Sequence, residues 1–266
     1  MIMTMLVVAR GVKGLERTVK FLMPALLAIL ILLIGYSMEQ GAFEQGVSFL
    51  FKADFSKVTS ESVLTAMGHA FFTLSLGMGA IMVYGSYLPS KVSIGSTASL
   101  IALTDTAVAL FAGLAIFPIV FANGLEPGSG PGLIFQTLPI AFGHMAYGSL
   151  FGTLFFILLV FAAWSSSISL IEPAVAWLVE NKNMSRMRAC IWAGLATWVV
   201  GIGTVLSFNL TADVTLLGKT FFDILDYLTA NVMLPLGGLC IAIFAGWIMS
   251  KEASAEELSF TKPVLY

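Results

Sequence analysis

The sequence predicts an all-α integral membrane protein with six transmembrane helices. Of its 266 residues, 58% are hydrophobic and 11% are charged, whereas a soluble domain carries about 25% charged residues. Six apolar segments approach the roughly 20 residues that a helix needs to cross a bilayer. The alternating pattern of a membrane β-barrel strand does not occur in them. The chain is therefore expected to cross a membrane several times.

The six spans follow one another along the chain, and we expect them at about 18–38, 62–88, 95–121, 148–179, 187–208 and 221–249. Residues 1–9 are apolar but too short for a seventh span, and they lack the basic leader and cleavage site of a signal peptide. The fourth segment could instead be two short ones. That division would place the later basic residues outside, so a single span is preferred.

Lysine and arginine residues predict the orientation of the spans. If six spans alternate, ten basic residues share one side: Arg10, Lys13, Arg17, Lys20, Lys91, Lys182, Arg186, Arg188, Lys251 and Lys262. Only Lys52, Lys57 and Lys219 fall on the other side. Because basic residues accumulate in cytoplasmic loops, this bias predicts that the chain starts in the cytoplasm.

The second span carries hydroxyl residues and glycines at mid-depth, in the run Phe71–Ala80. Thr73 and Ser75 precede Gly77 and Gly79, and each glycine costs about 1 kcal/mol relative to alanine in a helix. Transporters use such breaks to bind substrates and ions, because non-helical backbone at membrane depth must line a cavity. The run predicts a broken helix at a binding site, although membrane serines and threonines also bond to helix carbonyls or join helices.

Two further polar features lie inside spans. Asp105 is the charged residue of the third span, and it is either a cation ligand or a protonated group that bonds to a neighbouring helix. Ser165, Ser166, Ser167 and Ser169 lie midway along the fourth span, about one turn before Glu172-Pro173. They indicate either close helix packing or an oxygen-only site, which suits sodium better than a transition metal.

The connection at 122–147 begins rich in glycine and proline and then becomes apolar. It is either a short helix packed on the bundle or a lid over an outer vestibule. At the start of the sixth span, Asp223 and Asp226 fit the positive end of a helix dipole.

Several classes of function are not expected. The net charge is −2 without a basic patch, so a nucleic-acid partner is not predicted. Cys190 and Cys240 lie in apolar runs and are expected to be small core residues, not a disulfide or a metal site. His69 and His144 lie outside any nucleophile or metalloprotease motif, so we expect no catalytic residues and no organic cofactor.

Three motifs, in this order, resemble the neurotransmitter:sodium symporters. They are Phe-Phe-Thr-Leu-Ser-Leu-Gly-Met-Gly-Ala at 71–80, Gly-Pro-Gly-Leu-Ile-Phe-Gln-Thr-Leu-Pro at 130–139 and Ser-Ser-Ser-Ile-Ser-Leu-Ile-Glu-Pro at 165–173. The similarity runs from Arg10 to about Ser250 and is greatest to the bacterial branch, among transporters of multiple hydrophobic L-amino acids.

The resemblance implies a fold of two inverted five-helix repeats with a site at mid-membrane. This chain, residues 1–266, would be one partial transmembrane domain that matches the fifth to tenth family helices. It would hold the last helix of repeat one at about 18–38, repeat two at about 62–249 and an outer lid loop at 122–147. The broken first helix, which supplies half of the ligands in the family, would be absent. The chain is therefore expected to be either a fragment of a longer gene or a degenerate copy, and not to transport alone.

The resemblance also implies roles for individual residues. The first sodium ion would be held by Thr73 and Asp105, and the second by the carbonyl of Ala162 with Ser165 and Ser166. The aspartate at position 105, where many relatives have asparagine, implies transport without chloride. The substrate would contact Phe72, Thr73, Ser75, Met78, Ser166 and Leu170. The outer gate would use Asp226, with Asp223 as a second candidate, and the inner gate Tyr87 and Glu180.

The function that the resemblance implies is sodium-coupled symport of hydrophobic L-amino acids by alternating access. The expected location is the plasma membrane, here the inner membrane of a bacterium, and the expected partners are the amino acid, sodium ions and the lipid bilayer. The alternative is a membrane protein that does not transport and keeps part of the fold as a binding or scaffold module.

Overall fold

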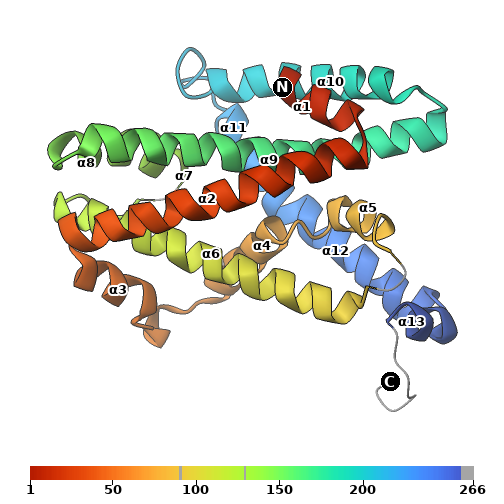
Figure 1. Ribbon diagram of the computed structural model, residues 1–266, viewed down its shortest axis with the longest axis horizontal. Coiled ribbons are helices and arrows are strands. Elements are labelled where there is room, and N and C mark those ends of the chain that lie inside the picture. Colours follow the sequence, from red (N-terminus) through yellow and green to blue (C-terminus); the bar gives the residue numbers. More distant parts are fainter. Residues whose placement is uncertain (90–91, 129, 259–266) are drawn as a thin grey trace. The chain divides into compact units, whose positions relative to one another are not determined.

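The computed structural model describes residues 1–89, 92–128 and 130–258, so Lys91 and Lys262 of the orientation argument lie outside the described residues. Five helical segments in this part of the chain are long and apolar enough to cross a membrane. They are α2 (Val12–Gln40), α6 (Ile94–Ala122), α9 (Gly148–Lys182), α10 (Arg186–Leu206) and the helical run Phe221–Ile248 (Figure 1). The predicted fold class, a helical multi-pass membrane protein, is confirmed.

The second predicted span, at about 62–88, is present as two helices with a break between them. Helix α4 covers Ser60–Thr73 and α5 covers Ala80–Ser86. The helical run Phe221–Ile248 is continuous but irregular: α11 (Phe221–Tyr227) and α12 (Leu234–Ile243) are joined by a π-helical turn, and a second one ends the run. The shorter helices are α1 (Ile2–Ala9), α3 (Phe43–Phe51), α7 (Gly130–Gly132), α8 (Leu138–His144) and α13 (Lys251–Glu257).

The predicted boundaries differ most at the first span. Helix α2 begins at Val12, directly after Gly11, and not near residue 18. The charged residues Lys13, Glu16 and Arg17 therefore lie within its first turns. Hydropathy marks only the apolar part of a helix, while long charged side chains allow the helix to continue into water. The fourth span is a single helix that passes through Pro173, as predicted.

The chain folds as two compact units. Unit 1 consists of Met1–Gly14, Val58–Leu103 and Ser167–Tyr266, and unit 2 of Leu15–Lys57 and Thr104–Ser166. The core of unit 2 combines side chains from α2, α6, α8 and α9, and its buried members are Leu30, Leu33, Tyr36, Ala115, Ile119, Val120, Leu138, Ala141, Phe142 and Phe155. The apolar half of the connection at 122–147 is thus a helical segment whose side chains enter this core.

Two buried polar side chains of α2 join the elements of unit 2. The Tyr36 hydroxyl donates to the Ala146 carbonyl at 2.7 Å, and its ring stacks on Phe151 with centroids 3.9 Å apart. The Ser37 hydroxyl donates to the carbonyl of Leu114 in α6 at 2.7 Å. Each polar atom is thereby satisfied without water, as a bilayer environment requires.

In unit 1, α1 packs against α10 and α4 packs against α12. Cys190 of α10 is buried, as predicted, whereas Cys240 of α12 is exposed. The prediction for Cys240 was wrong because the face of α12 that carries Leu236, Leu239 and Cys240 has no covering element in the described chain.

Candidate functional site

The break between α4 and α5 is formed by the backbone of Leu74–Gly79. Ser75, Gly77 and Gly79 have φ angles of 55°, 78° and 82°, in the left-handed region that glycine adopts at little cost. The amide of Leu76 still bonds to the Phe71 carbonyl at 2.8 Å. Among the described residues, the amides of Gly77, Met78 and Gly79 have no backbone partner. The predicted break is confirmed, and its peptide groups are available to other partners.

Four of the predicted substrate residues of unit 1, Phe72, Thr73, Ser75 and Met78, lie within or directly before this break. Phe72 is on the last turn of α4 and is 56% exposed. Ser75 and Met78 are half-buried within the break itself. Leu170 is on α9 and is 50% exposed. The break thus combines apolar side chains with free peptide groups.

The predicted second sodium site lies on α9, within unit 2. The hydroxyl of Ser165 donates a hydrogen bond of 2.9 Å to the Ala162 carbonyl, so two of the three predicted ligand oxygens are adjacent. Ser165 is buried and Ser166 is exposed. The two oxygens are of the hard, neutral kind that suits an alkali cation better than a transition metal.

The other predicted site residues are divided between the units. Asp105 is half-buried on α6 in unit 2, whereas Thr73 belongs to unit 1. The two residues predicted for the first sodium ion therefore belong to different units. The same holds for the substrate residues, because Ser166 belongs to unit 2 and the others to unit 1.

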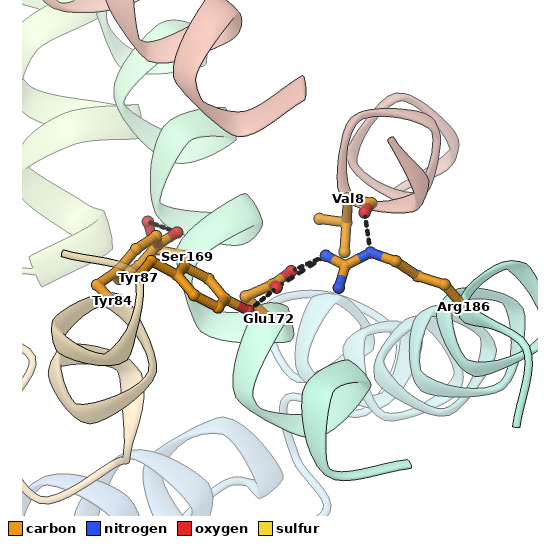
Figure 2. Close-up of polar contacts among 6 residues, drawn as sticks. All are labelled: Val8, Tyr84, Tyr87, Ser169, Glu172 and Arg186. Atoms are coloured by element: carbon orange, nitrogen blue, oxygen red, sulfur yellow. Dashed lines mark hydrogen bonds and ion pairs between the residues drawn. The ribbon is translucent and has the colours of Figure 1, made fainter. Parts of the chain in front are cut away.

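A buried carboxylate organises the end of unit 1 near α1, α5 and α10. Glu172 of α9 is 0% exposed, and Nη2 of Arg186 donates to both of its oxygens at 2.7 Å. The Tyr87 hydroxyl donates to Oε1 of Glu172 at 2.7 Å, and Nε of Arg186 donates to the Val8 carbonyl at 2.8 Å (Figure 2). We call Tyr87, Glu172, Arg186 and the Val8 carbonyl the Glu172 cluster. Buried charges persist only when paired in this way.

Neighbouring hydroxyls extend the polar contacts of the Glu172 cluster along α9. The Tyr84 hydroxyl donates to Oγ of Ser169 at 3.3 Å (Figure 2). Two residues before Ser169, Oγ of Ser167 is 2.8 Å from Oγ1 of Thr4, which is buried on α1. The serines of the fourth span therefore contact α1 and α5 through hydrogen bonds.

The predicted inner-gate residues are placed differently from each other. Tyr87 belongs to the Glu172 cluster, whereas Glu180 is exposed near the end of α9. Sequence reasoning missed Glu172 and Arg186 as a pair. The signal was available, because a glutamate inside an apolar span needs a cationic partner and Arg186 begins the next helix.

The predicted outer-gate residues also differ. Asp223 accepts hydrogen bonds from the amide and hydroxyl of Thr220 at 3.0 and 2.8 Å, so its carboxylate completes the capping box of α11. Asp226 is exposed one turn further along. The carboxylate of Asp226 is therefore the one not used for capping.

These features define a multi-pass helical membrane protein with one spanning segment broken at mid-length, a construction that transporters use to expose backbone groups to their cargo. The chain belongs to the sodium:neurotransmitter symporter family, whose model matches residues 1–262. The family consists of transporters and not of enzymes.

Two similar proteins come from bacteria. The chain is 42% identical to the sodium-dependent transporter YhdH of Bacillus subtilis, over 97% of this chain and 57% of that protein. It is 38% identical to a sodium-dependent transporter of Haemophilus influenzae, over 98% of this chain and 57% of that protein. The chain thus spans a little more than half the length of these relatives.

A solved structure is similar over almost the whole chain. The crystal structure of MhsT in complex with L-phenylalanine matches with a TM-score of 0.90 and 43% identity, and it covers 99% of this chain and 60% of that one.

Proposed function

We propose that this chain supplies part of the transport machinery for sodium-coupled symport of hydrophobic L-amino acids by alternating access. The observation that carries the proposal is the break at Leu74–Gly79, with free peptide groups beside apolar side chains. Two facts support it further: the chain belongs to a sodium symporter family, and the similar MhsT structure contains L-phenylalanine.

In this proposal the apolar part of the substrate rests on side chains around the break. Phe72, Met78 and Leu170 supply apolar surface, and Thr73, Ser75 and Ser166 supply hydroxyl groups. Met78 is unbranched and polarizable, so it adapts to different apolar shapes. A site of this composition favours a range of hydrophobic side chains over glycine.

Sodium is the coupled cargo. We propose Thr73 and Asp105 as ligands of one ion, and the Ala162 carbonyl with Ser165 and Ser166 as ligands of another. The short distance between the Ser165 and Ala162 oxygens supports the second set. The half-buried position of Asp105 on α6 supports the first, because a carboxylate inside a span requires a cation or a proton.

Two groups of residues in unit 1 are candidate gates. We propose Asp226 for the outer gate, because Asp223 is engaged in capping α11; Asp223 remains the second candidate. For the inner gate we propose Tyr87, and we add Glu172 and Arg186, which it joins. Glu180 stays a candidate at the exposed end of α9.

The experiment is a chimera in which this chain replaces the part of MhsT that it matches, so that its residues are tested within the length of that protein. Proteoliposomes take up labelled L-phenylalanine with sodium or choline outside, and MhsT is the control. We expect uptake with sodium alone. Equal uptake in choline would contradict the coupling. Binding of L-phenylalanine without uptake would favour a binding or scaffold module.

A further inference from the structure

The side of the break that faces α12 is made of glycine backbone. A Cβ atom added to Gly237 of α12 would overlap the Gly77 carbonyl oxygen and lie 3.2 Å from the Gly77 Cα. A Cβ atom added to Gly77 would overlap the Leu234 carbonyl oxygen and lie 2.9 Å from the Gly238 amide nitrogen. The two backbones therefore meet with no side chain between them.

The same contact continues along α4. A Cβ atom on Gly238 would overlap the ring of Phe71, whose carbonyl accepts the Leu76 amide of the break. One turn earlier, a Cβ atom on Gly68 would lie 3.2 Å from the Ala230 carbonyl oxygen in the π-helical turn before α12. Helix α12 therefore packs along α4 and also contacts the break that follows α4. Figure 1 shows α4 and α12 in the same part of unit 1.

We propose that Gly237 and Gly238 are positioning residues that form a seat for the broken segment. Within a bilayer, helices associate through close packing and not through the hydrophobic effect, so small residues set how near two backbones come. The segment has three residues with positive φ and few backbone hydrogen bonds of its own. Contact with the glycine seat, meaning Gly237 and Gly238, therefore fixes where its free peptide groups lie.

The seat also links the break to the start of the same helical run. Asp226 lies on α11, which continues through the π-helical turn into α12. A displacement of α11 along its axis is thus transmitted to Gly77 by one continuous helix. This role in gating rests on the proposed function, whereas the seat itself is a packing relationship within unit 1.

Helix propensity alone predicts the opposite effect for Gly237→Ala, so this variant distinguishes the two explanations. Alanine is a better helix former than glycine, so Gly237→Ala strengthens α12 if Gly237 has no special contact. Gly246 is the matched control: it lies in the same helical run, and an added Cβ atom there meets nothing within 4 Å.

The measurement is hydrogen–deuterium exchange of the 74–80 amides in the purified chain in nanodiscs. An extra methyl group in a packed interface costs 1–3 kcal/mol, so Gly237→Ala should speed exchange at Leu74 and Leu76 by about 5- to 140-fold. Gly246→Ala should leave the exchange rate unchanged. Equal rates in the two variants would overturn the proposal.

A rescue experiment covers the case in which Gly237→Ala does not fold. Gly238→Ala should speed exchange of the same amides, and the added change Phe71→Leu should slow it again, because the overlap is with the Phe71 ring. Failure of Phe71→Leu to slow exchange would overturn the seat. Neither exchange measurement needs sodium or an amino acid. A failure of the glycine-seat proposal is therefore distinguishable from a failure of the transport proposal.

Discussion

The Tyr87 hydroxyl donates a hydrogen bond of 2.7 Å to Oε1 of Glu172, a carboxylate that is fully buried within unit 1. The bond joins the end of α5 to α9 beside Arg186, which pairs with the same carboxylate. The sites proposed here lead to four predictions, on stability and on sodium and chloride dependence.

Tyr87→Phe removes the phenol donor but keeps the ring. Because a hydrogen bond to a charged group is worth about 1.5–3 kcal/mol, we expect a loss of this size in the unfolding free energy of the chain in detergent. Tyr84→Phe is the matched control, since its hydroxyl donates to neutral Ser169 at 3.3 Å. An equal or larger loss from Tyr84→Phe would contradict the importance of the Glu172 contact.

Arg186→Ala leaves the buried Glu172 carboxylate without its cation. Breaking a buried pair in this way costs about 3–5 kcal/mol, and we expect denaturant unfolding to reveal a loss of that order. Arg186→Lys should recover only part of it, because an ammonium group lacks the planar fork that reaches both Glu172 and Val8.

The control for Arg186 is a second arginine of the same helix. Arg188 is exposed, and removal of a surface side chain usually changes stability by no more than about 0.5 kcal/mol. The double change Glu172→Leu with Arg186→Met should be milder than Arg186→Ala alone. A double variant as unstable as Arg186→Ala would show that the unpaired charge is not the cause.

Ser166→Ala and Ser165→Ala each remove one proposed sodium ligand. In the MhsT chimera we expect the sodium concentration for half-maximal uptake to rise about tenfold, which corresponds to a loss of about 1.4 kcal/mol. Ser99→Ala is the control, because its exposed hydroxyl bonds to the Gly95 carbonyl within α6. Unchanged sodium dependence in a variant would remove that serine from the site.

Asp105→Asn removes the negative charge of the first proposed ion site. If this carboxylate balances the charge of the bound sodium, the variant should need an external anion, and uptake should become dependent on chloride. The measurement compares uptake in chloride and in gluconate at constant sodium. A variant with full activity in gluconate would refute the charge-compensation argument.

The helical fold and the break could be predicted from the sequence because both depend on local properties. Hydropathy locates spans directly, and Gly77 and Gly79 interrupt one of them where glycine is costly. The start of α2 was predicted too late, because the charged residues Lys13 and Arg17 hide a helix that hydropathy does not follow.

The Glu172 cluster and the glycine seat could not be predicted from local properties of the sequence. Arg186 reaches Glu172 only because the chain turns between the end of α9 and the start of α10, and Gly237 meets Gly77 across 160 residues of chain. A glutamate inside an apolar span still predicts that a cationic partner lies nearby. A glycine in an apolar helix gives no comparable signal, since its partner is a backbone that carries no sequence information.

The guanidinium of Arg186 holds the end of α1 and the carboxylate of α9 at the same time. Moving α1 away would remove the Arg186 hydrogen bond from the Val8 carbonyl. Moving α9 away would leave the Glu172 carboxylate unpaired in a low-dielectric interior. We therefore expect the ends of α1, α9 and α10 to travel as one block during any conformational cycle. Helix α5 is joined to α9 of this block by hydrogen bonds from the Tyr87 hydroxyl to Glu172 and from the Tyr84 hydroxyl to Ser169. Hydrogen bonds of this kind are contacts that a hinge can break and remake quickly.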